Sequence, residues 1–371
     1  SSVSRRLDRD SRLVLPGLDF RLSFRYEITY NFRMKVEPSL EDRFQGCLLG
    51  LAIGDALGYP TEFLTLPEIR KRYGPNGVQD LNGTPALHSD DTQTSMAVAR
   101  ALVEAGQNGV ENWMEALVRE FLIWLRSPEN DRAPGNTTIK GCQNLEAGIS
   151  WTESGLVESK SCGAIMRVAP IGLYFHGDPS ELRLAAWASS VATHAHPTAL
   201  VCAEATAFCV SWAVAGIDPS GYLERMKALQ RDSLQSWDPV LGKSWKRAGY
   251  ARPEDYLAAG WAQLLGELEK VPLALARDPA DVCEILGGGW GSDEALACAL
   301  ACVLKFPKDY MGAVRSGANT GGDSDSIACI AGAISGAYLG HKSIPKDWRR
   351  HIENRQPLID LSRQLYQKHA R

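Results

Sequence analysis

The clearest hydrophobic pattern lies in residues 316–340, SGANTGGDSDSIACIAGAISGAYLG. The second half of this stretch is apolar or small at nearly every position, which predicts a helix that is buried on all sides. Gly332 and Gly336 lie one helical turn apart, and this spacing lets another backbone approach closely, although glycine weakens an isolated helix. Because Asp323 and Asp325 precede the apolar half, we expect carboxylates at the mouth of a core helix.

A second glycine pattern marks residues 40–60, the first clear helix of the chain. Asp55 lies in this helix, where it can either accept hydrogen bonds from backbone amides or support a nearby site. Glu62 follows the helix end, and the residues alone favour an exposed glutamate beside the turn at Pro60. Four glycines recur at every fourth position and form one face that is open to close helix contact: Gly46, Gly50, Gly54 and Gly58.

Ser89, Asp90 and Asp91 open another amphipathic helix, which keeps helical period up to Gly106. Both acidic stretches allow two interpretations. Ordinary capping is one, because aspartate and serine are favoured N-cap residues. Metal binding is the other, because paired carboxylates at a buried helix start need compensating positive charge. Four carboxylates suit two Mg²⁺ or Mn²⁺ ions, and zinc is disfavoured because neither acidic cluster, 89–91 or 323–326, contains a Cys or His.

The rest of the chain indicates helices joined by polar loops, with almost no strand after residue 40. We expect loops at 64–88 (with a short polar helix), 128–141, 159–166 and 287–291, and an irregular segment at 218–252. Further helices are predicted at about 113–125, 180–192, 198–215, 256–268, 280–286, 293–304 and from 347 onward. If the acidic stretches near the two ends share one site, the helices between them form a single all-α bundle.

Composition narrows the class of protein. The chain has 371 residues, of which 44% are hydrophobic, and a net charge of -4, so it carries no nucleic-acid signature. Nine cysteines without zinc or redox spacing indicate core residues of a reducing compartment. No run approaches the length of a membrane span, and no apolar signal-peptide core is present. We therefore expect a cytoplasmic protein with no membrane or nucleic-acid partner.

Residues 1–38 differ from the rest of the chain. Residues 1–35 hold eight Arg or Lys against four Asp or Glu, which gives a net charge of +4 within an acidic protein. Residues 20–32, FRLSFRYEITYNF, alternate apolar and polar positions, which is typical of a strand or an extended segment. The segment is either an edge strand, inert upstream sequence, or an extended arm suited to an acidic cleft on a partner.

Seven short motifs, taken in order, resemble those of the ADP-ribosylglycohydrolase family, which includes dinitrogenase reductase-activating glycohydrolases and ADP-ribosylarginine hydrolases. The resemblance covers about residues 41–340, and the order makes it specific although each motif is short. It implies an all-α fold, two Mg²⁺ or Mn²⁺ ions, and hydrolysis of ADP-ribose from a side chain. The motifs are GCLLGLAIGDALGYPTEF, SDDTQTSMAVARAL, APGNTT, CGAIMRVAPIGL, THAHPT, GGGWGSDEALACAL and NTGGDSDSIACIAGAISGAYLG.

The resemblance also implies a site. Glu62 and Asp323 would orient a water or handle protons, which cleavage at the ribose anomeric carbon requires. Ser326 stands where the family usually has threonine, and the hydroxyl is kept. The implied metal ligands are Ser89, Asp90, Asp91, Asp323, Asp325 and Ser326.

The implied substrate-binding residues each keep a structural alternative. His194 would lie near the distal ribose or diphosphate, or it forms a helix-start pair with His196. Trp290 would stack on adenine, wall the pocket, or belong to the core. Arg167 is expected to be a structural ion-pair partner. The full implied set is Asn136, Thr137, Gly163, Ala164, His194 and Trp290.

Three functional hypotheses follow. The first is a metal-dependent hydrolase formed by residues 39–371 that removes ADP-ribose from modified proteins, most simply from arginine. The second is an immunity protein that neutralises an ADP-ribosyltransferase toxin through the arm at residues 1–38, with or without hydrolysis. The third is a non-catalytic structural relative, which the retention of every acidic ligand position disfavours.

Overall fold

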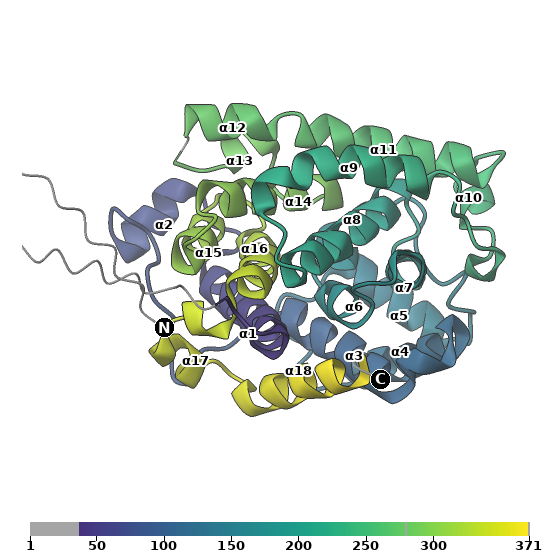
Figure 1. Ribbon diagram of the computed structural model, residues 1–371, viewed down its shortest axis with the longest axis horizontal. Helices are drawn as coiled ribbons and strands as arrows, with labels where there is room; N and C mark the ends of the chain where they lie inside the picture. Colours follow the sequence, from purple (N-terminus) through teal and green to yellow (C-terminus); the bar gives the residue numbers. More distant parts are fainter. Residues whose placement is uncertain (1–36, 279, 370–371) are drawn as a thin grey trace, which may run out of the picture. The chain divides into compact units, whose positions relative to one another are not determined.

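The computed structural model describes residues 37–278 and 280–369, and this part of the chain is helical throughout, with no β-strand. The expected all-α bundle is confirmed (Figure 1). The predicted strand at residues 20–32 lies outside the described residues. Buried side chains from all parts of the described chain join in one hydrophobic core, as a single helical body requires.

The α-helices vary in length from single turns to five turns. In chain order they are α1 (Leu40–Gly58), α2 (Leu66–Tyr73), α3 (Asp90–Ala105), α4 (Val110–Leu125), α5 (Asn136–Glu146), α6 (Ala169–Tyr174), α7 (Pro179–Val191), α8 (Pro197–Val214), α9 (Tyr222–Ser233), α10 (Ser244–Arg247), α11 (Pro253–Leu268), α12 (Val271–Arg277), α13 (Cys283–Leu286), α14 (Ser292–Lys305), α15 (Tyr310–Ala318), α16 (Ser324–Leu339), α17 (Lys346–His351) and α18 (Arg355–His369). Short 3₁₀ turns lie between them: η1 (Tyr59–Thr61), η2 (Gly106–Asn108), η3 (Cys162–Ala164), η4 (Pro219–Gly221), η5 (Pro239–Leu241) and η6 (His341–Ser343).

Two expectations about loops are wrong. The segment 218–252, expected to be irregular, contains α9 and α10. Its hydrophobic residues are sparse, but Tyr222, Met226 and Leu229 recur at helical spacing and are buried, so packing on the body decides the structure. The loop expected at 128–141 ends early, because α5 begins at Asn136.

The centre of the body is the pair α1 and α16, which lie side by side in Figure 1. Their backbones touch along the predicted glycine face. A Cβ atom added at Gly46 would lie less than 3.0 Å from the carbonyl oxygen of Gly336, and one at Gly54 equally close to that of Ala328. Because the N-terminal half of α1 meets the C-terminal half of α16, the two helices run antiparallel. The close approach that both glycine patterns predicted is confirmed.

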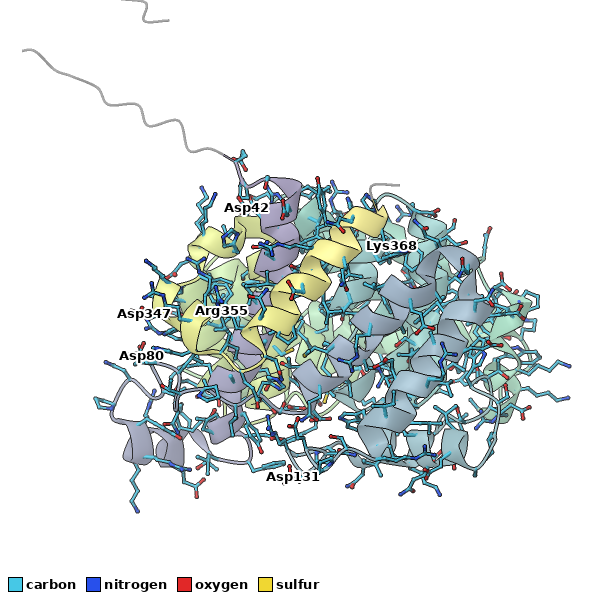
Figure 2. All side chains as sticks on the ribbon, turned by 90° about the horizontal axis from the view of Figure 1, so that it is seen from below. Asp42, Asp80, Asp131, Asp347, Arg355 and Lys368 are labelled. Carbon is cyan, nitrogen blue, oxygen red and sulfur yellow. The ribbon has the colours of Figure 1, made fainter. Side chains whose placement is uncertain are left out.

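Other helices enclose this pair. α15, α14 and α8 pack against α16, and α18 crosses α1 on the side shown in Figure 2, with charged side chains such as Arg355 and Lys368 on its surface. α8 is long and apolar enough to span a membrane by length and composition alone, but 94% of it is buried among the other helices, as in the core helix of a helical body. All nine cysteines are unpaired, and most are buried.

We predict that Gly332→Ala lowers the thermal stability of the protein, because the new methyl group would lie less than 3.0 Å from the carbonyl oxygen of Gly50. Overpacking typically costs about 1–3 kcal/mol and outweighs the gain of up to about 1 kcal/mol in helix propensity. Thermal unfolding followed by circular dichroism measures the effect.

The matched control is Gly266→Ala in α11, an exposed helical position where an added Cβ atom meets no neighbour. This control should raise the free energy of unfolding by about 0.5–1 kcal/mol through helix propensity alone. If both variants are stabilised equally, the backbone contact between α1 and α16 does not hold the fold as described.

Candidate active site

The C-terminal end of α1 is tied to the start of α16 by a hydroxyl group. The Oγ1 atom of Thr61 contacts the carbonyl oxygens of Gly58 and Ala318, at 2.7 and 2.6 Å, and lies 3.1 Å from the hydroxyl oxygen of Ser324. Ser324 in turn donates to the carbonyl oxygen of Gly58. The chain therefore leaves η1 at a fixed point, and Glu62 is delivered beside α16.

The start of α16 presents its carboxylates without using them as caps. Asp323 occupies the N-cap position, but its side chain accepts no hydrogen bond from the helix backbone. One of its oxygens accepts instead from the thiol of Cys162, at 2.7 Å. Asp325 accepts from the amide of Ser326 next to it, and its carboxyl group also lies within hydrogen-bonding reach of Glu62 and Asp323. Capping therefore does not account for this pair, and the metal-binding interpretation is favoured here.

The start of α3 is built differently. The hydroxyl of Ser89 accepts from the amide of Asp91, so Ser89 is a true cap. Asp55 of α1 accepts from the amides of Ser89 and Thr92, at 2.8 and 2.9 Å. The structural role considered for Asp55 is confirmed: it ties α3 to α1, while Asp90 and Asp91 remain for the site.

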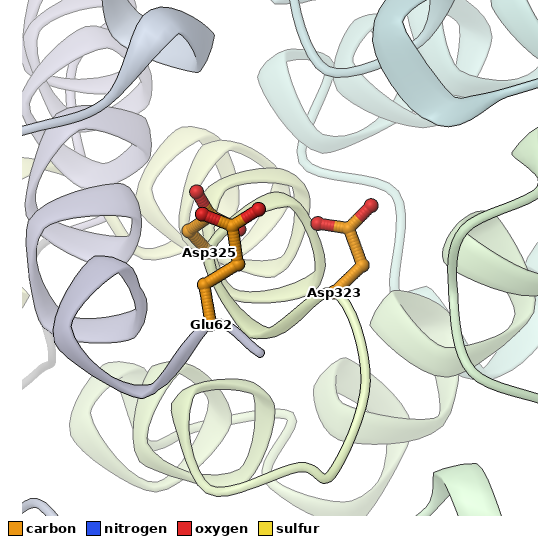
Figure 3. Close-up of side chains that lie close together, drawn as sticks. All are labelled: Glu62, Asp323 and Asp325. Atoms are coloured by element: carbon orange, nitrogen blue, oxygen red, sulfur yellow. The ribbon is translucent and has the colours of Figure 1, made fainter. Parts of the chain in front are cut away.

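These three segments meet on one cavity of about 420 Å³. The two acidic stretches from opposite ends of the chain therefore converge, as the shared-site hypothesis requires. Carboxylate oxygens of Glu62, Asp323 and Asp325 lie within 4.8 Å of one another, and the three groups point into the same space (Figure 3). The hydroxyl of Ser326 lies 3.4 Å from a carboxylate oxygen of Asp91, which joins the stretches directly.

Burial and mutual repulsion raise the pKa values of these acids. Burial, followed by the charges of Asp323 and Asp90, raises the pKa of Glu62 to about 8. Burial also holds the pKa of Asp90, Asp91 and Asp325 well above the usual range, with neighbouring carboxylates adding to the effect. The site is therefore built to hold positive charge.

No lysine or arginine of the described residues lines the cavity. The nearby ion pairs join Lys160 to Asp293 and Arg132 to Glu353. Neither includes a carboxylate of the cavity floor, which is formed by Glu62, Asp90, Asp91, Asp323 and Asp325. One oxygen of Asp91 and one of Glu62 are buried without any hydrogen-bond partner. Unpartnered buried carboxylate oxygens are costly, and oxygen donors of this kind are those that Mg²⁺ and Mn²⁺ prefer. The residues present therefore fit divalent cations.

One premise of the sequence analysis needs correction. Zinc was disfavoured because no cysteine accompanies the acidic stretches, yet the fold brings the thiol of Cys162 against Asp323. The hydroxyl of Ser326 also contacts this sulfur, at 3.6 Å. Burial, followed by the charge of Asp323, holds the pKa of Cys162 well above its usual range. The group is therefore a protonated thiol that donates to Asp323, and oxygen atoms still dominate the site.

Four of the six implied substrate-binding residues line the cavity: Asn136, Thr137, Gly163 and Trp290. Asn136 and Thr137 belong to the first turn of α5, not to the loop that was expected at 128–141. Trp290 is 44% exposed, so the core alternative for it is wrong. The contact of these residues with a substrate stays a prediction.

Ala164 and His194 are fully buried and lie behind the cavity wall. A ring nitrogen of His194 lies 2.8 Å from the hydroxyl of Ser161, which does line the cavity. The ring of His196 accepts a hydrogen bond from the amide of Thr198 and caps α8, so the helix-start interpretation is confirmed for His196. Arg167 is structural, but its partners are the carbonyl oxygens of Gly163 and Ser189 and the hydroxyl of Thr193, not an acidic group.

Several lining residues escaped the sequence analysis, notably Phe63, Ala133, Cys162 and Met166. Phe63 and Ala133 have positive φ angles of 64° and 54°, a conformation that costs energy outside glycine and gathers at functional sites. All four stand inside the quoted motifs. Hydrophobic periodicity gives no sign that apolar side chains there face a cavity.

Comparison with known proteins agrees with this site. Residues 36–371 match the sequence model of the family described as ADP-ribosylglycohydrolase. An uncharacterized protein of Archaeoglobus fulgidus is 32% identical over 340 residues, which cover 90% of this chain and 98% of that protein. A solved structure described as an ADP-ribosylglycohydrolase-related protein complex shares the fold, with a TM-score of 0.64 and 23% identity over 89% of this chain and 99% of its own.

Two characterised relatives are named for related activities. The ADP-ribosylarginine hydrolase of Serratia proteamaculans is 25% identical over 337 residues, covering 88% of this chain and 79% of its own. An ADP-ribosylhydrolase of Xenopus tropicalis, named for no particular acceptor, is 26% identical over 360 residues, covering 89% of this chain and 96% of its own. With a family model that spans all but the first 35 residues, the chain belongs to the ADP-ribosylglycohydrolase family, whose members hydrolyse linkages to ADP-ribose.

Proposed function

We propose that this protein is a divalent-metal-dependent hydrolase that releases ADP-ribose from modified arginine side chains. The observation that carries the proposal is the group of five buried or half-buried carboxylates on one cavity, which no lysine or arginine of the described residues lines. Such a group is costly to fold unless a ligand of positive charge completes it.

Two Mg²⁺ or Mn²⁺ ions suit the number and kind of donors. Asp323, Asp325 and Ser326 would hold them from α16, and Asp90 and Asp91 from α3. The buried Asp91 oxygen without a partner is free to bind. Ser89 does not line the cavity. Its hydroxyl oxygen already accepts from the amide of Asp91, so it would bind a metal ion only through its second lone pair. Bound divalent ions would supply positive charge and lower the pKa of a bound water toward 7.

Glu62 is the residue that we expect to carry the proton. Its Oε2 atom is buried without a partner, and one of its carboxylate oxygens lies within 4.8 Å of oxygens of Asp323 and Asp325. A carboxyl group with these properties takes a proton from an attacking water and returns it to a leaving group efficiently. Asp323, held by the thiol of Cys162, is fixed well enough to orient that water.

The wall opposite Glu62 suits the diphosphate of ADP-ribose. α5 begins there with Gly135 in the N-cap position, and Asn136 and Thr137 form its first turn. Free amides at a helix start attract anions. Gly163 also lines the cavity, and packing requires glycine there because a Cβ atom would collide with the buried Thr138 and His194.

Arginine is the proposed acceptor because the Serratia relative is named for it. The Xenopus relative, named for no acceptor, keeps serine and other linkages as substrates to compare. The toxin-neutralising hypothesis depends on residues 1–38, almost all of which lie outside the described residues, and it stays a prediction.

We predict that the purified protein releases free ADP-ribose from ADP-ribosylated arginine in the presence of Mg²⁺ or Mn²⁺, and that a chelator stops the reaction. Glu62→Gln should lower kcat by about 10²–10⁴-fold, since the amide cannot accept the proton. Chromatography of released ADP-ribose measures both effects, with a serine-linked substrate run in parallel.

The matched control is Glu284→Gln, the same chemical change at an exposed position of α13. It should leave kcat unchanged. Full activity in chelator, or a Glu62→Gln variant as active as this control, would refute the proposed chemistry.

We also predict that Mg²⁺ raises the melting temperature of the protein more at about pH 8.5 than at about pH 6. In the metal-free protein the pKa of Glu62 is raised above its ordinary value, and so are those of the neighbouring aspartates. Their contribution to stability is therefore complete below about pH 4.5 and is lost as the pH rises through about 8. Metal ions replace the lost protons.

Differential scanning fluorimetry across this pH range measures the shift. Asp325→Asn, which removes one carboxylate, should flatten the pH dependence of the metal-free protein and shrink the Mg²⁺ effect. A shift that is equal at both pH values would contradict the link between the carboxylates and the metal.

A further inference from the structure

Two exposed aromatic side chains stand together at the cavity. Among the exposed large hydrophobic side chains of the described residues, only Phe63, at 70% exposure, and Trp290, at 44%, are aromatic. Their rings stack on each other, with centroids 5.4 Å apart and planes 16° from parallel. Both line the same cavity as the carboxylates. Aromatic surface that is left open to water beside a site points to a ligand that covers it.

The backbone holds both rings in place at a cost. Phe63 has a φ angle of 64°, which is strained for a side chain of this size. Backbone hydrogen bonds hold the residues on either side of it: the amide of Glu62 donates to the carbonyl oxygen of Gly58, and the amide of Leu64 donates to that of Thr61. Trp290 is held through its carbonyl oxygen by the amide of Cys162, at 3.0 Å. Strain that is kept for an exposed ring indicates that the position of the ring matters for function.

The pair stands beside the reacting end of the substrate. Phe63 directly follows Glu62, and a Cβ atom at Gly289, next to Trp290, would lie 3.4 Å from Cβ of Asp323. The carbonyl oxygen of Gly288 accepts from the amide of Asp323, at 2.8 Å. Adenine is separated from the reacting carbon by a ribose and two phosphates, whereas the acceptor is bonded to that carbon. The place of the rings therefore matches the acceptor.

The charge at this end selects the kind of acceptor. Five carboxylates face this cavity and no lysine or arginine of the described residues lines it, so a cation is favoured beside them. An arginine side chain that carries ADP-ribose remains a planar, delocalised cation, and such groups stack on aromatic faces. A serine acceptor has neither the charge nor the plane.

From these observations, which rest on the proposed function, we infer that Phe63 and Trp290 form the acceptor subsite and stack on the guanidinium group of ADP-ribosylated arginine. The rings set the preference for arginine over acceptors without a flat cation. The ADP-ribose half of the substrate binds on the other side of the carboxylates and does not depend on them.

Steady-state kinetics of four proteins test this inference: the wild type, Trp290→Leu, Trp290→Phe and Phe63→Gly. We expect Trp290→Leu to raise the KM for ADP-ribosylated arginine, and the inhibition constant of agmatine as a free guanidinium probe, by about 2- to 30-fold. Trp290→Phe keeps an aromatic face and should restore most of the affinity. The inhibition constant of free ADP-ribose should change by less than about twofold in all variants.

Phe63→Gly separates binding from folding. Glycine adopts a φ angle of 64° without strain, so the melting temperature should stay the same or rise while the KM for the arginine substrate increases. A rise in KM with an unchanged melting temperature therefore reports lost contact with the acceptor, not a damaged fold.

Three results would overturn the inference. If the inhibition constant of ADP-ribose rises as much as that of agmatine, the rings bind the nucleotide half. If Trp290→Leu and Phe63→Gly leave both the KM for the arginine substrate and the inhibition constant of agmatine unchanged, the two rings do not bind the acceptor. If the wild type cleaves a serine linkage but not an arginine linkage, the proposed function fails, and the inference fails with it. This outcome is distinguished from the other two because it is seen in the wild type, without any variant.

Discussion

The contact between the backbones of α1 and α16 is the constraint on which the site depends. Glycine on α1 meets glycine or alanine on α16 along most of the helix pair, so the two axes come closer than side chains would allow. The contact continues to the catalytic end, where a Cβ atom at Gly58 would collide with the backbone of Asp325. The spacing of the helices thus fixes the distance between the segment that carries Glu62 and the segment that carries Asp323 and Asp325.

The same end of the molecule concentrates buried negative charge, and its hydrogen bonds keep that charge in place. Asp55 accepts from two backbone amides at the start of α3 and from the hydroxyl of Thr92. Thr61 and Ser324 join α1 to α16 through their hydroxyl groups. Because these partners are buried, the carboxylates that face the cavity cannot relax away from one another, and burial, with repulsion added to it, raises their pKa values. The fold thereby prepares a site for cations before any cation binds.

Glycine spacing in residues 40–60 and 316–340 was enough to predict that each helix has a face open to close contact with another backbone, but not that the two helices are each other's partner. The convergence of Asp90 and Asp325 followed from the resemblance, since no local pattern links residues more than two hundred positions apart. Sequence reasoning failed where packing decides the outcome. α9 was missed because few of its residues are apolar, and Cys162 was missed because its contact with Asp323 exists only in three dimensions.

The floor and the walls of the cavity are built from different kinds of structure. The floor stands on α1, α3 and α16, which the core holds, whereas the walls come from residues 133–137, 161–163 and 290, which lie in loops, in the 3₁₀ turn η3 and in the first turn of α5. Substitutions in the walls leave the backbone contact and the carboxylates unchanged, while a substitution in the floor disturbs both. Among relatives at about one quarter identity, one is named for arginine as the acceptor and another for no acceptor. The specificity of such an enzyme for its acceptor is then a property of a few wall residues, and it can change without a new catalytic centre.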